Sequence, residues 1–120
     1  MGPKILVCGG RNFADRKLLA RTLAELAPSL IVHGGCPTGA DHLTELWALD
    51  HGVPTCVYLA QWRLYGRRAG PLRNQEMIDR EPDLNLVVAF AGGRGTADML
   101  RRARAAGLNI STPTPAVTPS

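Results

Sequence analysis

Three short apolar runs that each end in a pair of glycines constrain the fold of this chain more than any other feature. The runs are KILVCGG, LIVHGG and LNLVVAFAGG, and their glycine pairs are Gly9-Gly10, Gly34-Gly35 and Gly92-Gly93. Apolar runs of about four to eight residues that stop at turn residues are typical of buried strands. Because these runs are apolar throughout rather than alternating, they indicate a parallel sheet that is covered on both faces.

Segments with helical periodicity separate the apolar runs. The first follows Asp15, a good N-cap residue, and ends before Pro28; the last ends at Gly107, a residue suited to a helix C-terminus. PTCVYLA and LNI predict two further strands. The four expected helices cover residues 15–27, 38–51, 71–80 and 96–106, with an arginine-rich loop before the third.

Alternating strands and helices predict one α/β domain. We expect a Rossmann-like, three-layer domain at residues 3–111, with a doubly wound parallel sheet of about five strands. The remaining residues, 112–120, are rich in Pro, Ser and Thr and predict a flexible tail. Ligands of such sheets bind at the carboxyl ends of the strands, which is where the glycine pairs lie.

Composition narrows the class of protein further. The chain has no apolar run approaching the roughly 20 residues that span a bilayer, and its first residues lack the features of a signal peptide. Its three cysteines include no CxxC pair, so we expect no disulfide framework and no metal site, with Cys8 and Cys56 in the core. We therefore expect a cytoplasmic protein without a membrane partner.

The glycine turns have a common chemical use. Glycines at strand ends allow tight turns that expose successive N–H groups, and the helix that follows adds its own free N–H groups and positive dipole end. The alternative is that each glycine serves only to connect a strand to a helix. Three such turns together favour an anion cradle, with Gly95 and Thr96 extending the third turn.

The second turn offers alternatives for its polar residues. Thr38 and Asp41 fit a capping box, in which Thr38 bonds a backbone N–H and Asp41 reaches back. Asp41 could instead bind a ribose hydroxyl or an amino group of a ligand. His33 could polarise a ligand, although a hydrogen bond to a neighbouring loop is the more common role of such a histidine. The dinucleotide fingerprint GxGxxG and the Walker A lysine are both absent.

Four motifs in order are similar to those of the SLOG superfamily: CGGRNF, VHGGCPTGAD, WRLYGRRAGPLRNQEM and VVAFAGGRGTADM. The resemblance covers residues 4–110 and is strongest to the short YspA-like branch. The superfamily includes the LOG phosphoribohydrolases of cytokinin riboside monophosphates and the Rossmann domain of DNA-processing protein A. The resemblance implies a Rossmann-like fold that binds nucleotides or nucleotide-derived ligands at the glycine turns.

The LOG signatures PGGxGTxxE and RKxxM match this chain incompletely. Gly92, Gly93, Gly95 and Thr96 match the phosphate turn, and Arg73 and Met77 match the second motif. Asn74, however, replaces the lysine, and Met99 stands where the LOG enzymes carry a catalytic glutamate that stabilises developing positive charge.

These observations predict a domain that binds a nucleotide-like phosphate ligand such as AMP, ADP-ribose or an NAD derivative, with no cofactor required. The alternative is an N-glycosidic hydrolase in which Asp41 or Asp98, with Arg73, supplies the catalytic groups. A lesser alternative is binding of single-stranded nucleic acid, which the net charge of +4 permits and the low aromatic content disfavours. The expected ligand residues are Gly9, Gly10, Arg11, Gly34, Gly35, Thr38, Asp41, Arg73, Asn74, Gly92, Gly93, Arg94, Gly95 and Thr96.

The arginine-rich segment also has the composition of a protein interface. Trp62 and Tyr65 with nearby arginines are typical of interface hot spots. We expect Arg73 in the pocket and the two aromatic residues in packing or in contact with a second copy of the chain. The resemblance implies a homo-oligomer.

Overall fold

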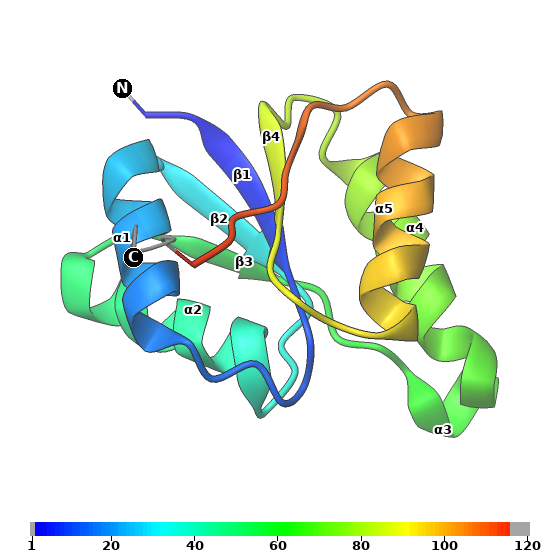
Figure 1. Ribbon diagram of the computed structural model, residues 1–120. Helices are drawn as coiled ribbons and strands as arrows, with labels where there is room; N and C mark the ends of the chain where they lie inside the picture. The colour runs from blue at the N-terminus through cyan, green and yellow to red at the C-terminus, as the bar shows by residue number, and fades with distance from the viewer. Residues whose placement is uncertain (1, 116–120) are drawn as a thin grey trace.

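A five-stranded sheet, parallel throughout, lies at the centre of the computed structural model, which describes residues 2–115 (Figure 1). Its strands run in the order β3-β2-β1-β4-β5. The chain leaves β1 and β4 on opposite faces of the sheet, so the sheet is doubly wound and Rossmann-like, as predicted. The strands are β1 (Lys4–Cys8), β2 (Leu30–His33), β3 (Thr55–Val57), β4 (Leu86–Ala89) and β5 (Ile110–Ser111).

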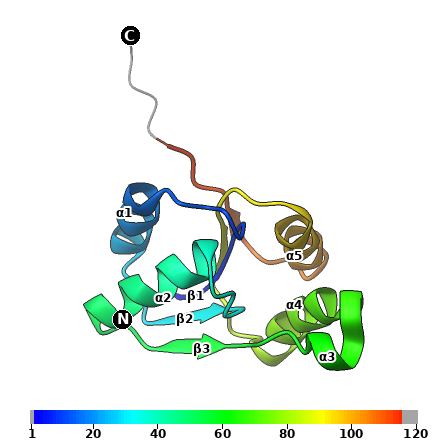
Figure 2. The same ribbon diagram turned by 90° about the horizontal axis from the view of Figure 1, so that it is seen from below.

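Helices cover both faces of the sheet. α1 (Arg16–Leu26) and α2 (Gly39–His51) lie on one face, and α4 (Ala69–Arg80) and α5 (Arg94–Ala105) lie on the other (Figure 1). A short helix, α3 (Trp62–Tyr65), and a 3-10 turn at Gly66–Arg68 lead directly into α4, and Figure 2 shows α3 beside the start of α4. The three layers confirm the predicted architecture.

The strands divide their side chains between two cores. Ile5 and Val7 are fully buried against α1 and α2, whereas Leu6 and Val87 are fully buried against α4 and α5. Successive residues of a strand point to opposite faces, so a strand with a helix on each side must be apolar throughout. This is the physical reason for the continuous apolar runs of the sequence.

The helix boundaries mostly follow the expected capping residues. The Asp15 side chain accepts a hydrogen bond from Leu18 N at 3.0 Å and caps α1. α2 ends at Gly52, with a φ of 66°, and Gly107 follows α5 with a φ of 74°. In these left-handed positions glycine has no Cβ penalty.

Two predicted boundaries were wrong. The arginine-rich segment is not a loop, because α3 and the 3-10 turn occupy it, and α4 begins at Ala69 rather than Pro71. Proline is accepted there because it lies in the first turn of the helix, where its missing N–H has no partner to lose. α5 likewise begins at Arg94, two residues before Thr96.

The last strand ends at Ser111, and residues 112–115 form no helix or strand. Residues 116–120, which make up the rest of the predicted tail, lie outside the described residues. Among residues 2–115, no helix has both the length and the apolar character needed to cross a bilayer.

Candidate functional site

An open groove of about 1400 Å³ lies at the carboxyl ends of β1, β2 and β4. β1 and β4 are neighbours in the sheet, and their connections leave toward opposite faces, so the groove lies at the topological switch point. The structure brings all the residues expected from the sequence to bind ligand, and also Asp98, to the wall of this groove.

The three glycine turns pack against one another. Gly10 N donates to Ala91 O at 2.9 Å, and Ala40 N donates to Gly10 O at 3.1 Å, so the turn after β1 bridges the other two. A Cβ on Gly9 would lie 2.5 Å from the Ala40 Cβ, and one on Gly10 would lie 2.9 Å from Ala91 O. Close packing between turns therefore explains the first glycine pair.

Packing also explains Gly34 and Gly92. A Cβ on Gly34 would overlap the guanidinium of Arg73, and one on Gly92 would overlap the hydroxyl of Thr96. For these two glycines, and for Gly9 and Gly10, packing alone accounts for the glycine, so a ligand is not needed to explain it.

Gly93 and Gly95 differ from the other glycines of the groove. A Cβ on either would meet no protein atom within 4 Å, and neither has a positive φ. Side-chain packing of the described residues therefore gives no reason for glycine at either position. Both are exposed on the groove wall, at the start of α5.

The start of α5 presents free backbone donors to the groove. The helix's first hydrogen bond runs from Ala97 N to Gly93 O at 3.0 Å, so the N–H groups of Arg94, Gly95 and Thr96 precede its ladder. The N-cap residue is Gly93, which has no side chain to satisfy them. Such an end attracts anions through these donors and through the helix dipole.

Arg73 extends from α4 to the loops after β2 and β3. Its Nη1 donates to Gly34 O at 2.8 Å and to Tyr58 O at 3.3 Å. Burial lowers the pKa of Arg73, and the nearby Asp41 carboxylate opposes this effect. The guanidinium thus stays a cation beside the groove and at the same time holds two loops together.

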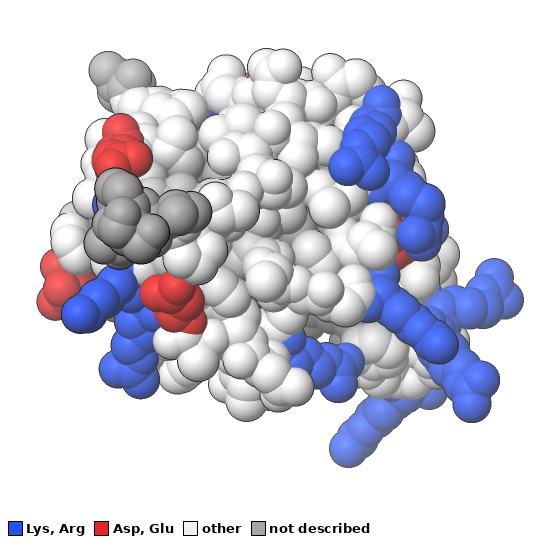
Figure 3. All heavy atoms as spheres, in the orientation of Figure 1, with Lys and Arg blue, Asp and Glu red and all other residues white. Residues whose placement is uncertain are grey.

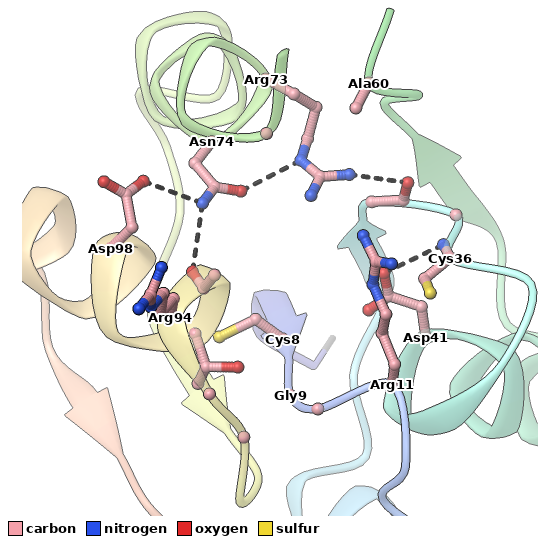
Figure 4. Close-up of a pocket in the computed structure, with 18 of the residues that line it drawn as sticks. Cys8, Gly9, Arg11, Cys36, Asp41, Ala60, Arg73, Asn74, Arg94 and Asp98 are labelled. Atoms are coloured by element: carbon pink, nitrogen blue, oxygen red, sulfur yellow. Dashed lines mark hydrogen bonds between the residues drawn. The ribbon is translucent and has the colours of Figure 1, made fainter. Parts of the chain in front are cut away.

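Asn74 joins α4 to the start of α5. Its Oδ1 accepts from Arg73 Nε at 3.0 Å, and its Nδ2 donates to Asp98 Oδ2 at 3.0 Å and to Gly95 O at 3.3 Å. Figure 4 shows this chain of hydrogen bonds along one side of the groove. Asn74 is 4 % exposed, so its amide acts as a buried brace behind the glycine turn.

Asp98 lines the groove, but its carboxylate is already engaged. It accepts from Arg102 Nε at 2.8 Å and from Arg101 Nη2 at 3.4 Å, in addition to Asn74. Burial favours its neutral form, but the hydrogen bonds from Arg102 and Asn74 outweigh burial and lower its pKa. Asp98 is therefore an ionised, paired carboxylate.

Asp41 lies on the opposite side of the groove from Asp98 (Figure 4). Its Oδ2 accepts from Cys36 N at 3.2 Å. Burial raises the pKa of Asp41, although the Cys36 N–H and the nearby His33 and Arg73 oppose that rise. The predicted capping box was wrong: Thr38 is the N-cap of α2 but makes no side-chain capping bond, and Asp41 reaches past it to residue 36.

His33 supports the second glycine turn. Its Nδ1 accepts from Gly35 N at 3.0 Å, and its Nε2 lies 2.7 Å from Glu45 Oε1. A backbone N–H can only donate, so the ring proton must be on Nε2, facing the carboxylate. The loop-bracing role is thus the one His33 has in this structure, and the ring is 2 % exposed.

The structure also places Cys8 and Met99, two sulfur-containing residues that the sequence singled out. Cys8 and Cys56, both expected in the core, pack against the core beneath α4 and α5 and are partly buried. Cys8 also borders the groove, and burial raises its pKa to about 12 and keeps it a thiol. Met99 is fully buried among the apolar side chains beneath α5. The position of the LOG glutamate is thus occupied here by a core residue that does not reach the groove.

The groove has a surplus of positive charge. Arg11, Arg67, Arg73, Arg94 and Arg101 line it, against two carboxylates, Asp41 and Asp98. Figure 3 shows arginines gathered on the side of the molecule formed by α3, α4 and α5. This balance favours an anionic ligand.

Several groove residues were missed by sequence reasoning. The segment from β3 to α4 contributes Leu59, Trp62, Arg67 and Pro71, and α5 contributes Arg101. The signal in the sequence was Gly70, a glycine near the start of a helix: a Cβ there would lie 3.3 Å from Cη2 of the Trp62 indole. That glycine marks where an aromatic ring crosses the helix.

The fold and groove define a Rossmann-like domain with its site at the strand ends, and sequence comparison identifies its family. Residues 3–65 match the model of the YspA, cpYpsA-related SLOG family. The chain is also 32% identical over 117 residues to the Gene 61 protein of Mycobacterium phage D29, with 89% of this chain and 93% of that protein covered. The chain therefore belongs to the YspA, cpYpsA-related SLOG family.

Proposed function

We propose that this protein binds a nucleotide or a nucleotide-derived ligand, with a phosphate seated at the start of α5. The observation that carries the proposal is the pair Gly93 and Gly95. Packing gives no reason for glycine at either position, and both border the free N–H groups of α5. A phosphate that approaches the backbone closely would require that a side chain be absent there.

Other groove residues support an anionic ligand of this size. Arg94 lies beside the same turn, and Arg73 places a second cation on the groove wall. Asp41, on the far side, can accept a hydrogen bond from a ribose hydroxyl or an amino group. Membership of the SLOG family agrees with a nucleotide-derived ligand. AMP, ADP-ribose and NAD are the first ligands to test.

Isothermal titration with these three compounds tests the proposal. We expect saturable binding of at least one, and no binding of any at millimolar concentration would overturn the proposal. Gly95→Leu should abolish binding, because its side chain would fill the open space beside the phosphate turn. Ala106→Leu is the matched control: it adds the same side chain at the exposed far end of α5 and should leave affinity unchanged.

Hydrolysis of the N-glycosidic bond is a second candidate function, and it depends on Asp41. Met99 is in the core and Asp98 is paired with arginines, so Asp41 is the better placed of the two candidate carboxylates to stabilise positive charge on a ribose. Release of free base from a panel of nucleoside monophosphates tests this function. Asp41→Asn should abolish any release; turnover that survives this change would remove Asp41 from the mechanism.

We also propose that copies of the chain associate with one another. Large apolar side chains are exposed on α2 and α3: Leu49 is 72% exposed, Leu64 66% and Tyr65 48%. Sedimentation velocity at several protein concentrations would detect the assembly, and a monomer at all of them would contradict it.

A further inference from the structure

We propose that the indole of Trp62 is the surface on which the base of the bound nucleotide stacks. This inference rests on the proposed function and assigns the second half of the ligand site. Its starting point is that Trp62, although a large aromatic residue, is 49% exposed and lines the groove.

The groove has two distinct sides. Figure 4 shows Arg94, Asn74 and Asp98 on the side of α5, and Arg11, Asp41 and Cys36 on the other. The Arg11 guanidinium lies over the Trp62 ring, 5.8 Å from its centroid. Trp62 therefore lies between the loop after β1 and the first turn of α4, in the same groove as the proposed phosphate site.

Trp62 is also the aromatic residue of the groove whose ring is not packed into the core. Among the described residues, Phe13 and Trp62 are the aromatic side chains on the groove wall. The Phe13 ring packs against Phe90 at a centroid distance of 5.0 Å, within the core beside α1. Trp62 is left as the aromatic group free to meet a ligand.

The neighbours of Trp62 hold it in place. Gly70, in the first turn of α4, admits the indole edge because a Cβ there would lie 3.3 Å from Cη2. Glycine within a helix costs about 1 kcal/mol relative to alanine. The cost of Gly70 is explained if the position of the Trp62 ring matters for binding. Arg11 covers the ring from the loop after β1 and adds a cation that can also face the ligand.

Leu59, Ala60 and Pro71 are further apolar residues of the groove wall. A groove that offers an exposed indole, further apolar residues and a buried carboxylate fits a planar heteroaromatic ring whose amino group or attached ribose reaches Asp41. The chemistry therefore points to a ligand that carries a base, and not to a sugar phosphate alone.

The test compares AMP with ribose 5-phosphate, which share the phosphate and ribose and differ in the base. Trp47→Phe leaves Trp62 as the sole tryptophan, and we expect AMP but not ribose 5-phosphate to change its fluorescence. Trp62→Ala should weaken AMP binding roughly 5- to 150-fold, the range for one aromatic stack, and leave ribose 5-phosphate binding unchanged. Leu72→Ala is the matched control: it truncates an exposed apolar side chain on α4 that does not line the groove, so both affinities should persist.

The possible outcomes are distinct. An AMP to ribose 5-phosphate affinity ratio that Trp62→Ala leaves unchanged overturns the stacking role while the proposed function stands. Failure of AMP, ADP-ribose and NAD alike to bind the wild-type protein overturns both proposals. Gly70→Ala provides a second variant, since its added methyl should shift the indole and reduce AMP affinity without removing the aromatic ring. Thermal unfolding of each variant checks that the fold is retained.

Discussion

The Arg73 guanidinium occupies the space in which a side chain at residue 34 would lie, and its Nη1 donates to Gly34 O at 2.8 Å. This contact ties α4 to the loop after β2 across the groove. The glycine is therefore part of a packed joint, in contrast to Gly95, whose surroundings are open.

This contrast predicts opposite effects for two alanine substitutions. Gly34→Ala should lower the free energy of unfolding by about 1–3 kcal/mol, because the added methyl must displace Arg73. Gly95→Ala, in the first turn of α5, should not lower stability, because alanine suits a helix better than glycine and meets no protein atom there, but it should weaken phosphate binding. Urea denaturation and phosphate titration of both variants check this. Equal loss of stability in the two would contradict the distinction.

Asn74 is expected to brace the first turn of α5. Asn74→Ala removes its hydrogen bonds to Arg73, Gly95 and Asp98 and should cost about 1–3 kcal/mol, since buried partners are left unsatisfied. Hydrogen exchange of the Ala97 N–H, which makes the first hydrogen bond of α5, should speed up more than that of the amides in the last turn. Asp79→Ala, on the exposed side of the same helix, is the control and should have little effect on either measurement.

Asp41 should cost the protein stability when no ligand is bound. Its pKa in the folded protein is raised above the ordinary value of 3.8, so the folded state binds the proton more tightly than the unfolded state. Stability is therefore lost as the pH rises through the folded-state value, and Asp41→Asn should unfold at a higher temperature at pH 7 than the wild type.

The same reasoning fixes the pH dependence of the Asp41→Asn effect. The difference in melting temperature should shrink as the pH falls and vanish below 3.8, where the aspartate becomes neutral in both states. Thermal scans across this range measure it. A variant less stable than the wild type at pH 7 would show that the carboxylate is needed by the fold.

Cys8 should make the protein sensitive to alkaline pH. Its pKa rises from 9.0 to about 12 on folding, so its contribution is full below pH 9 and is lost as the pH rises toward 12. Within that window the wild type should lose up to about 1.4 kcal/mol per pH unit more than Cys8→Ala. Urea denaturation of both proteins at several alkaline pH values measures the difference; parallel slopes would contradict the assignment.

The fold was largely predictable because its signals are local. Each buried strand is a continuous apolar run, and Asp15, Gly52 and Gly107 mark helix ends through their own backbone chemistry. The candidate site was also predicted as a set of residues, since parallel strands place their carboxyl ends at one edge of the sheet. The short helix α3 was missed because its four residues carry no helical periodicity.

The role of each groove residue could not be predicted from the sequence, because these roles depend on contacts between distant segments. Gly9, Gly10, Gly34 and Gly92 are explained by packing and Gly93 and Gly95 are not, although all six read alike in the chain. Thr38 and Asp41 have the spacing of a capping box, yet the loop path sends Asp41 to Cys36 N. The sequence by itself thus determined the strands, turns and family of this protein. Only the tertiary structure decided which glycines face open space and which of Asp41 and Asp98 forms salt bridges with arginines. Both outcomes depend on which side chains lie next to these residues.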